Sequence, residues 1–532
     1  MRVAVIAPPY PLEEAPAPPL GVCYVAAAFE AAGCEVAIFD FVVSEYSKAK
    51  LAKLMGEFAP DVVGSTSVTL NFTSAAQIVC DAKDINPAIL TMMGGPHVSF
   101  YAKETLAQYP GIDMIIRGEG EQTIAELVPV LKDPGSWSGI KGITYREGDG
   151  VAETGTRDFI KDLDTLPFPS RHLLPLSRYK ALGFPISIIT SRGCPHQCIF
   201  CLGRRMVGAK VRYRDPVLVV DEIEHLLSLG FPRINVADDL FASNKERVAA
   251  VCGEIRRRNL NFGWSAFARV NTVDEEVVRT MKEAGCDCIA FGIESGNTEM
   301  LKRVKKGITK EQVLKAKEVC EKVGMSVHGS FIVGLPGETA ETLAETEKFA
   351  NGLKFLHGYH YLAPFPGTTL YEDIDKYEIE LLTRDWSLYD ANRPVTRTPG
   401  ASPEDVIAFV HRFEDECNEE WAKLEKGYID GTNTPMENLR VEGNRKLPVS
   451  FKVIAGDMID SCGALPSAGA VTDTEALDIL SDRISAETGF DPILVKKVLS
   501  DFKRGGHITI VEKPDGTRTW AWSPNPAHAK KN

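Results

Sequence analysis

The stretch "TSRGCPHQCIFC" carries the clearest chemical signal in this chain. Its three cysteines, Cys194, Cys198 and Cys201, follow the spacing C-x3-C-x2-C. The whole chain has 12 cysteines in 532 residues. At that frequency chance would produce this spacing about 0.006 times per chain, so the motif requires a chemical explanation.

Three thiols are too few for a structural zinc site, which takes four ligands. Neither another cysteine nor a histidine at finger-like spacing supplies the fourth, and the ring of His196, inside the loop, would strain to join its neighbours. An iron-sulfur cubane usually takes four thiolates, so three would leave one iron open to a non-protein ligand. The motif therefore favours a cluster that binds a small molecule.

The elements that must position this loop form two alternating series of strands and helices. In the first 140 residues, short apolar runs alternate with amphipathic stretches, as in a parallel sheet with helices on both faces. The strands are expected at residues 3–7, 35–39, 61–66, 89–93 and 114–116. Ligands bind beyond the carboxyl ends of such strands, so residues 1–140 are interpreted as a Rossmann-like binding domain.

The second series predicts a barrel that carries the cysteines. Its strands are expected at residues 186–190, 233–236, 263–267, 288–293, 326–333 and 358–363. Six such units predict a partial (β/α)6 barrel over residues 185–400, with its chemistry at the carboxyl ends of the strands. Cys194 follows the first of these ends. A proline-containing linker over residues 141–184 joins the two units.

The last part of the chain, residues 401–532, is expected to be mainly helical. Helices near residues 473–488 and 493–505 precede two alternating strands around an Asp-Gly turn, which suggests a winged-helix unit over residues 470–524. Such a unit could recognise DNA, pack on the body or cover the substrate. The basic residues of its second helix form only a modest cluster among acidic neighbours, which favours packing or covering.

Composition and charge narrow the class of protein. The formal net charge of -13 argues against a general nucleic-acid surface or an anionic-membrane surface. The start of the chain shows no secretion signal. The longest apolar run near it, residues 22–29, is too short to cross a bilayer. We therefore expect a soluble, cytoplasmic protein without a membrane partner.

The cysteine motif and the strand ends that follow it resemble the radical S-adenosylmethionine superfamily. Members of that family carry an aromatic residue before the last cysteine, the position of Phe200. The stretches "NVADDLF", "SAFARVN", "IAFGIESG" and "SFIVGLPGET" end the second to fifth strands, as in that family. The resemblance implies a [4Fe-4S] cluster whose open iron binds S-adenosylmethionine and whose electron cleaves it to a 5′-deoxyadenosyl radical. Ser330 and Ile332 would line the adenine end.

The same resemblance implies roles for charged residues at the strand ends. Asp238 or Asp239 would hold the amino group of S-adenosylmethionine, Arg269 its carboxylate, and Glu294 its ribose or amino group. Carboxylates suit an ammonium group and hydroxyls, and a guanidinium suits a carboxylate. The alternatives are that Asp239 caps the following helix and that Arg269 or Glu294 makes a barrel salt bridge.

The strand-end loops of the first domain resemble the cobalamin-binding domain that precedes the barrel in one class of these enzymes. They read "APAPPLGVCYVAAAFEAAG", "GSTSVTLN", "GGPHVSF" and "RGEGEQT", and their glycines allow close approach to a flat ligand. A domain that merely packs on the barrel is the alternative. No histidine has the D-x-H-x-x-G spacing of many cobalamin proteins, which leaves the lower ligand of cobalt open. The residues implied to bind cobalamin are Pro19, Leu20, Gly21, Ser65, Thr66, Ser67, Gly94, Gly95, Pro96, His97, Gly118, Glu119, Gly120 and Glu121.

Together these resemblances imply an enzyme with a [4Fe-4S] cluster, S-adenosylmethionine and cobalamin. The commonest reaction among relatives is methylation of an unactivated carbon through methylcobalamin. The alternative is radical oxidation or ring closure without methyl transfer, as in the anaerobic oxidative cyclase of bacteriochlorophyll synthesis. The expected partners are a small-molecule substrate and a one-electron donor such as flavodoxin or ferredoxin. A cobalamin-responsive DNA-binding regulator is a third hypothesis, which the intact cysteine motif disfavours.

Overall fold

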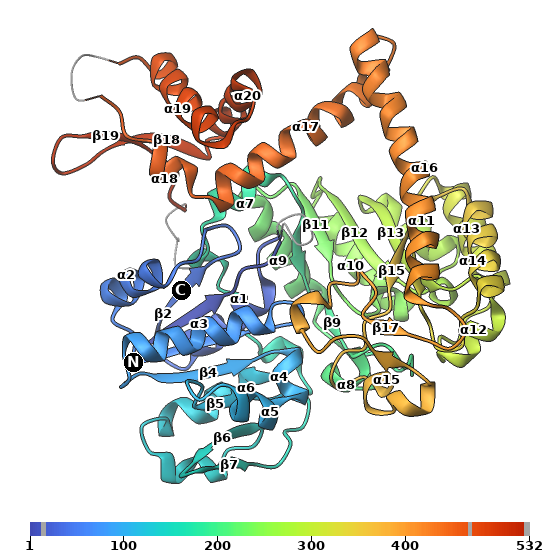
Figure 1. The fold of residues 1–532 in the computed structure, drawn as a ribbon, viewed down its shortest axis with the longest axis horizontal. Helices are drawn as coiled ribbons and strands as arrows, with labels where there is room; N and C mark the ends of the chain where they lie inside the picture. The colour runs from blue at the N-terminus through green and yellow to red at the C-terminus, as the bar shows by residue number, and fades with distance from the viewer. Residues whose placement is uncertain (12–16, 467–470, 526–532) are drawn as a thin grey trace.

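The computed structural model describes residues 1–11, 17–466 and 471–525. Two alternating units and a helical C-terminal region follow one another along the chain, as the sequence predicts (Figure 1). Residues 15 and 16 of the first predicted loop, residue 470 of the predicted winged-helix unit and residues 526–532 lie outside the described residues. Within the described ranges, every helix is too short or too polar to traverse a lipid bilayer.

The N-terminal unit is built on a seven-stranded sheet with the order β2-β1-β3-β4-β5-β6-β7. The first five strands are parallel and the last two antiparallel. The five predicted strands are confirmed, but the sheet continues to Glu153, so the boundary predicted at residue 140 is too early. The hairpin of β6 and β7 is stabilised by pairing with β5, a contact that local sequence does not reveal. The strands are β1 (Arg2–Ala7), β2 (Glu35–Asp40), β3 (Val62–Thr66), β4 (Leu90–Gly94), β5 (Met114–Ile116), β6 (Ile143–Glu147) and β7 (Gly150–Glu153).

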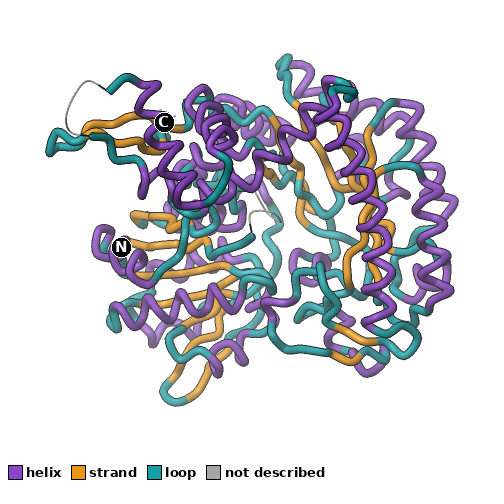
Figure 2. The backbone as a smooth tube through the Cα atoms, turned by 45° about the horizontal axis from the view of Figure 1, so that its top comes forward, coloured by secondary structure: helices purple, strands orange, loops and turns teal. Residues whose placement is uncertain are grey.

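Apolar residues on both faces of the parallel strands explain why helices cover both sides (Figure 2). Along β1, Val3 and Val5 belong to a core cluster with residues of α1, whereas Ala4 and Ile6 belong to another cluster with residues of α2 and α3. A parallel sheet buried in this way presents the carboxyl ends of its strands at one edge. The helices are α1 (Leu20–Ala31), α2 (Lys48–Phe58), α3 (Phe72–Ile85), α4 (Pro96–Phe100), α5 (Ala102–Gln108) and α6 (Gly120–Leu127).

The second unit is the predicted partial barrel. Its six parallel strands have the order β15-β14-β13-β12-β11-β8, and in the described part of the chain β15 and β8 do not pair to close it. The strands are β8 (Ile186–Ile188), β11 (Arg233–Val236), β12 (Gly263–Ala268), β13 (Cys286–Glu294), β14 (Ser326–Val333) and β15 (Leu356–Tyr361). The covering helices are α9 (Pro216–Ser228), α10 (Lys245–Arg257), α11 (Glu275–Glu283), α12 (Thr298–Arg303), α13 (Lys310–Val323) and α14 (Ala340–Leu353).

Short segments connect the two units and tie them together. The linker contains α7 (Leu176–Leu182), and a strap after β15 contains α15 (Thr369–Glu372), β16 (Glu380–Leu381) and β17 (Thr396–Arg397). Trp386 and Tyr389 of this strap share a core cluster with Phe72 and Val98 of the N-terminal unit. The barrel is therefore fixed against the first domain by buried apolar contacts.

Two long helices lead from the barrel to a small C-terminal unit (Figure 1). Ser402 and Asp405 form a capping box, and Pro403 occupies the first turn, which explains where the first long helix begins. The predicted helices and hairpin of the C-terminal unit are present. The elements are α16 (Pro403–Asp430), α17 (Pro435–Ala455), α18 (Met458–Cys462), α19 (Asp473–Thr488), α20 (Pro492–Arg504), β18 (Ile508–Glu512) and β19 (Arg518–Trp522).

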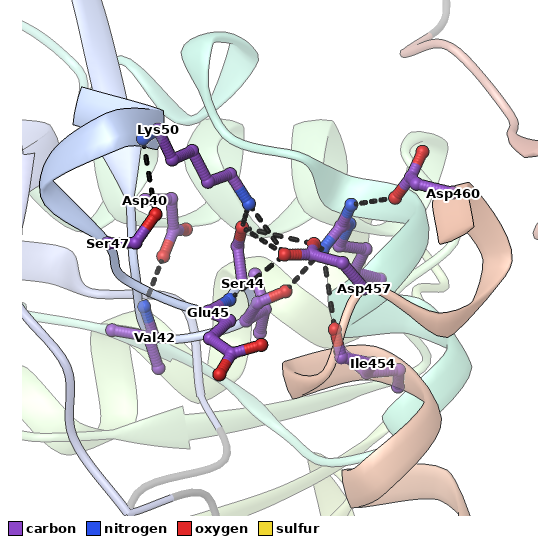
Figure 3. A network of polar contacts seen from close by, with 11 residues as sticks. Asp40, Val42, Ser44, Glu45, Ser47, Lys50, Ile454, Asp457 and Asp460 are labelled. Carbon is purple, nitrogen blue, oxygen red and sulfur yellow. Dashed lines mark hydrogen bonds and ion pairs between the residues drawn. The ribbon is translucent and has the colours of Figure 1, made fainter. Parts of the chain in front are cut away.

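Hydrogen bonds and ion pairs of Asp457 attach the C-terminal unit to the N-terminal unit and the linker (Figure 3). The Asp457 carboxylate accepts hydrogen bonds from Lys50 Nζ at 2.6 Å, Arg178 Nη1 at 2.6 Å and Ser44 Oγ at 3.1 Å. In Figure 1 this unit lies at the opposite end of the molecule from β9 and α8 of the cysteine loop. It packs on the body, as expected, and it does not cover the cysteine loop.

Candidate functional site

The cysteine loop leaves the first barrel strand through a short hairpin. β9 (Ser191–Arg192) pairs antiparallel with β10 (Arg212–Tyr213), and α8 (Gly203–Val207) lies within the loop that they close. Gly193 has φ +112°, and a Cβ atom there would lie 2.3 Å from the carbonyl oxygen of Lys210. Because only glycine fits this position, Gly193 allows the chain to turn directly before Cys194.

The three thiols lie close to solvent and are free. Cys194 and Cys198 are half-buried, and Cys201 is exposed. The backbone N–H of Gly203 donates to Cys201 Sγ at 3.4 Å, and the N–H of Cys201 donates to the carbonyl of Cys198 at 3.2 Å. These contacts order the loop around Cys198 and Cys201.

The donor set fits a cluster better than a single ion. Among the residues that the structure describes, no three ligand side chains converge on one point where a metal ion could bind. A cubane instead takes one thiolate at each of several irons. Burial raises the pKa of the Cys194 thiol, so cluster binding would release a proton from it. Three thiolates would occupy three corners of a cubane and would leave the fourth iron to a small molecule.

Arg269, at the end of β12, points at this loop. Its Nη1 lies 3.7 Å from Cys198 Sγ, and its Nη2 donates to the carbonyl of Lys306. The residue is only 6% exposed, and it forms no salt bridge with any described residue. The alternative of a structural ion pair is therefore not realised for Arg269. Its charge is available next to the cysteine loop.

The two aspartates after β11 have different surroundings. Asp238 is buried and accepts hydrogen bonds from the N–H and Oγ1 of Thr190 and from Ser191 Oγ, all at 2.6 Å. Asp239 lines the cavity between the two units that is described below. Burial and the neighbouring Asp238 raise the pKa of Asp239. The helix that follows is capped by Asn244, so Asp239 is not the cap that the alternative expected.

Glu294 ends β13 in a strained conformation. Its φ of +71° is rare for a residue with a side chain, and such strain concentrates at functional sites. Glu294 Oε1 accepts from Lys306 Nζ at 2.6 Å, and both side chains are nearly buried. The predicted alternative of a barrel salt bridge is thus formed for Glu294. No motif spacing in the sequence marks Lys306 as a residue of this site.

Ile332, predicted for the adenine end together with Ser330, lies near Phe200 of the cysteine loop. Phe200 and Ile332 pack against the same apolar cluster, which includes Ile199 and Leu335. Ser330 lies two positions before Ile332 on β14, so both side chains face the same side of the sheet. The structure brings these residues together at the carboxyl end of the barrel.

The "GLPGE" segment after β14 forms a turn. Gly334 and Gly337 have φ values of +83° and +77°. Glu338 is buried, and its Oε2 accepts from the N–H groups of Gly334 at 2.5 Å and Leu335 at 3.1 Å. Burial raises the pKa of Glu338 to about 7. This carboxylate therefore stabilises the turn.

A cavity of about 340 Å³ lies between the strand-end loops of the first domain and the mouth of the barrel. Its wall is mostly apolar and glycine-rich on the first-domain side. On the barrel side it includes Ser191, Ala237, Asp239 and Met206. A single space therefore borders both the first-domain loops and the cysteine loop.

The glycines of this cavity form a cradle. A Cβ atom on Gly21 or Gly118 would meet no other atom within 4 Å, so a larger side chain at either position would project into the cavity. At Gly95, which has φ +100°, a Cβ atom would lie 2.5 Å from Thr66 Oγ1. The cradle fits a broad apolar ligand such as a corrin. The predicted cobalamin residues that line the cavity are Gly21, Ser65, Thr66, Gly94, Gly95, Pro96, Gly118, Glu119, Gly120 and Glu121.

Four predicted cobalamin residues are not part of this lining, namely Pro19, Leu20, Ser67 and His97. His97 is buried in an aromatic cluster, where its ring stacks on Phe72 at 4.0 Å and meets Trp386 at 5.0 Å. Its Nδ1 lies 3.2 Å from Thr69 Oγ1, and its Nε2 has no partner among the described residues. Burial lowers the pKa of His97 to about 3. His97 therefore supports the packing of the strap and does not face the cavity.

Known proteins share both units of this chain. The family model described as B12 binding domain matches residues 14–128, and the model described as Radical SAM superfamily matches residues 188–350. An uncharacterized methyltransferase of Pyrococcus horikoshii is 36% identical over 398 residues, covering 74% of this chain and 86% of that protein. The anaerobic magnesium-protoporphyrin IX monomethyl ester cyclase of Rubrivivax gelatinosus is 32% identical over 381 residues, covering 68% and 67%.

The fold is also that of a solved structure. The radical S-adenosylmethionine methyltransferase TsrM from Kitasatospora setae, solved with cobalamin and a [4Fe-4S] cluster, superposes with a TM-score of 0.62 at 17% identity. The match covers 95% of this chain and 99% of that chain. With the thiol triad, the shared cavity and these matches in agreement, the chain belongs to the family of cobalamin-binding radical S-adenosylmethionine enzymes.

Proposed function

We propose that this protein is a cobalamin-dependent methyltransferase that adds a methyl group to an unactivated carbon of a small molecule. The observation that carries the proposal is the shared cavity, because its wall joins the glycine cradle of the first domain to Asp239 and Ser191 at the barrel mouth. A cluster held by the three thiols would supply the electron that cleaves S-adenosylmethionine to a 5′-deoxyadenosyl radical. Cobalamin held in the cavity would supply the methyl group. The chain positions the reacting groups and excludes water.

Each charged residue at the barrel mouth has a task in this proposal. Arg269 lies beside Cys198, so it binds the carboxylate of S-adenosylmethionine next to the open iron. Asp239, and not Asp238, binds the amino group, since Asp238 already accepts hydrogen bonds from Thr190 and Ser191. Lys306 holds one oxygen of Glu294, which leaves the other oxygen for a ribose hydroxyl.

Phe200, Ser330 and Ile332 line the adenine end in this proposal. The cavity residues of the four strand-end loops, with Pro19, Leu20 and Ser67 beside them, hold cobalamin. His97 is excluded from that set because it packs into the aromatic cluster. A one-electron donor such as flavodoxin or ferredoxin reduces the cluster, and the protein acts in the cytoplasm.

Radical oxidation or ring closure is the second candidate function. The cyclase of Rubrivivax gelatinosus matches two thirds of this chain at 32% identity, and the two reactions use the same pair of domains. A DNA-binding regulator has less support. The lysines of α20 are already paired, Lys496 with Asp478 at 2.5 Å and Lys497 with Glu442 at 2.8 Å, which leaves little positive charge for phosphates.

Product analysis distinguishes the two reactions. The full chain is reconstituted anaerobically with iron, sulfide and cobalamin, then mixed with S-adenosylmethionine and a reductant. Deoxyadenosine together with S-adenosylhomocysteine is expected for methyl transfer, whereas deoxyadenosine alone would support the cyclase-like reaction. The variant Cys198→Ala should form no deoxyadenosine. Cys417→Ala, at an exposed cysteine of α16, is the matched control and should behave as the wild type.

A further inference from the structure

A buried network of charges joins the cavity wall to the neck of the cysteine loop. Glu119 accepts from Arg212 through both oxygens, at 2.9 Å each, and from Arg192 Nη1 at 3.3 Å. Glu121 accepts from Arg192 Nη2 at 2.6 Å. The backbone N–H of Ile160 also donates to Glu119, at 2.7 Å. No side chain of the four charged residues is more than 10% exposed.

Glu119 compensates for two like charges that the register of the β9–β10 hairpin places opposite each other. Arg192 and Arg212 are directly paired across β9 and β10, and like charges opposite each other destabilise a strand pair. Glu119 bridges both guanidinium groups, and it comes from the other domain. Removing its charge would leave Arg212 without a carboxylate partner, opposite Arg192, which would keep only Glu121.

The same residues form part of the cofactor cavity. Glu119, Glu121 and Arg192 all line it, and the Arg192 guanidinium stacks over the ring of Tyr24, which also lines it, at 5.3 Å. Arg192 lies two residues before Cys194. The position of the cavity wall and the position of the first cluster ligand are therefore set by one rigid group of side chains.

We propose that this network couples the two cofactors: the cluster, once assembled, orders the hairpin neck and thereby tightens cobalamin binding, and cobalamin in turn stabilises the cluster. Glu119 is the positioning residue through which the coupling passes. Thermodynamic linkage requires that each ligand changes the affinity for the other by the same factor. The inference rests on the cofactors of the proposed function but not on methyl transfer, so the two can fail separately.

The test compares cobalamin affinity in two states of the full chain. Hydroxocobalamin is titrated anaerobically into protein stripped of iron by a chelator and into protein reconstituted with iron and sulfide. The dissociation constant is expected to be about 10-fold lower in the reconstituted protein, equal to about 1.4 kcal/mol of coupling. Equal dissociation constants in the two states of the wild type would overturn the inference, whatever the outcome for methyl transfer.

The variant Glu119→Gln identifies the residue that carries the coupling. In this variant the dissociation constants of the iron-free and the reconstituted protein for hydroxocobalamin are expected to differ by no more than about twofold. Glu126→Gln is the matched control, because Glu126 lies on the same domain as Glu119, is 52% exposed and forms an ion pair with Arg157 away from the network. The ratio of its two dissociation constants should equal that of the wild type. A wild-type ratio in Glu119→Gln would overturn the assignment.

A milder variant and a second measurement keep the test decisive if Glu119→Gln folds poorly. Arg192→Lys keeps the charge but loses the forked contact with Glu119 and Glu121, so an intermediate ratio is expected. The rate at which a chelator removes iron from the reconstituted protein should fall when hydroxocobalamin is present in the wild type. In Arg192→Lys this protection should be weaker, and full protection would contradict the inference.

Discussion

The substitution Asp457→Asn tests how firmly the C-terminal unit is held. Asp457 has φ +52°, a conformation that asparagine also adopts readily, so the change removes the charge without adding backbone strain. The carboxylate accepts from Lys50 and Arg178 at 2.6 Å each and from the backbone N–H of Glu45 at 3.1 Å (Figure 3). All of these donors belong to other units of the chain.

The size of the effect follows from the contacts. Hydrogen bonds to charged groups contribute about 1.5–3 kcal/mol each. However, Lys50 is one third exposed and Arg178 keeps its contact with Asp460 at 2.7 Å, so both retain part of their stabilisation. We expect the free energy that holds the unit in place to fall by about 2 kcal/mol, which increases local opening roughly 30-fold.

Hydrogen exchange read by mass spectrometry measures this opening. Exchange should rise in α18 and in residues 43–47, with other regions unchanged. Burial opposes ionisation of Asp457, but its hydrogen bonds from Lys50 and Arg178 outweigh this and lower its pKa. The stabilisation is therefore present above the ordinary aspartate pKa of about 4 and is lost as the pH falls through the lowered value.

The control is Asp460→Asn. The Asp460 side chain is 53% exposed and, among the described residues, is paired with Arg178 alone, so its loss should change the same free energy by less than about 0.5 kcal/mol. Unchanged exchange in Asp457→Asn at pH 7 would refute the reasoning. So would a difference from the wild type that persists at a pH where Asp457 is protonated.

Four further substitutions test the site. Asp239→Asn should weaken binding of S-adenosylmethionine to the reconstituted protein without lowering the melting temperature. Asp238→Asn should lower the melting temperature, because an NH2 group replaces one of the two carboxylate oxygens that accept hydrogen bonds from Thr190 and Ser191. A reversed pattern would contradict the assignment. Lys306→Met leaves Glu294 buried without its partner and should cost about 3 kcal/mol in denaturant unfolding, so a loss below about 0.5 kcal/mol would be inconsistent with the pair. His97→Phe should leave the absorption spectrum of bound cobalamin unchanged, and a spectral change would place His97 near cobalt. The wild type should lose stability as the pH falls from about 6.5 toward 3, because in that range His97 is protonated in the unfolded chain but not in the folded protein. The variant should lose less.

Much of the fold was predictable because the same local pattern of apolar and polar residues recurs in each strand-helix unit. The apolar strands alternate with amphipathic helices, and a buried parallel sheet is the arrangement that satisfies both. The hairpin of β6 and β7 was not predictable, since its strands are short and are stabilised by pairing with β5. For the same reason the domain boundary moved from residue 140 to Glu153.

The sequence by itself determined the ligand chemistry, because a spacing such as that of Cys194, Cys198 and Cys201 constrains a short loop whatever surrounds it. Only the tertiary structure decided which of two adjacent aspartates faces the cavity, that His97 does not, and that Glu119 reaches across to Arg192. These outcomes depend on burial and on partners from distant parts of the chain. Neither burial nor contacts between distant segments can be read from the order of neighbouring residues.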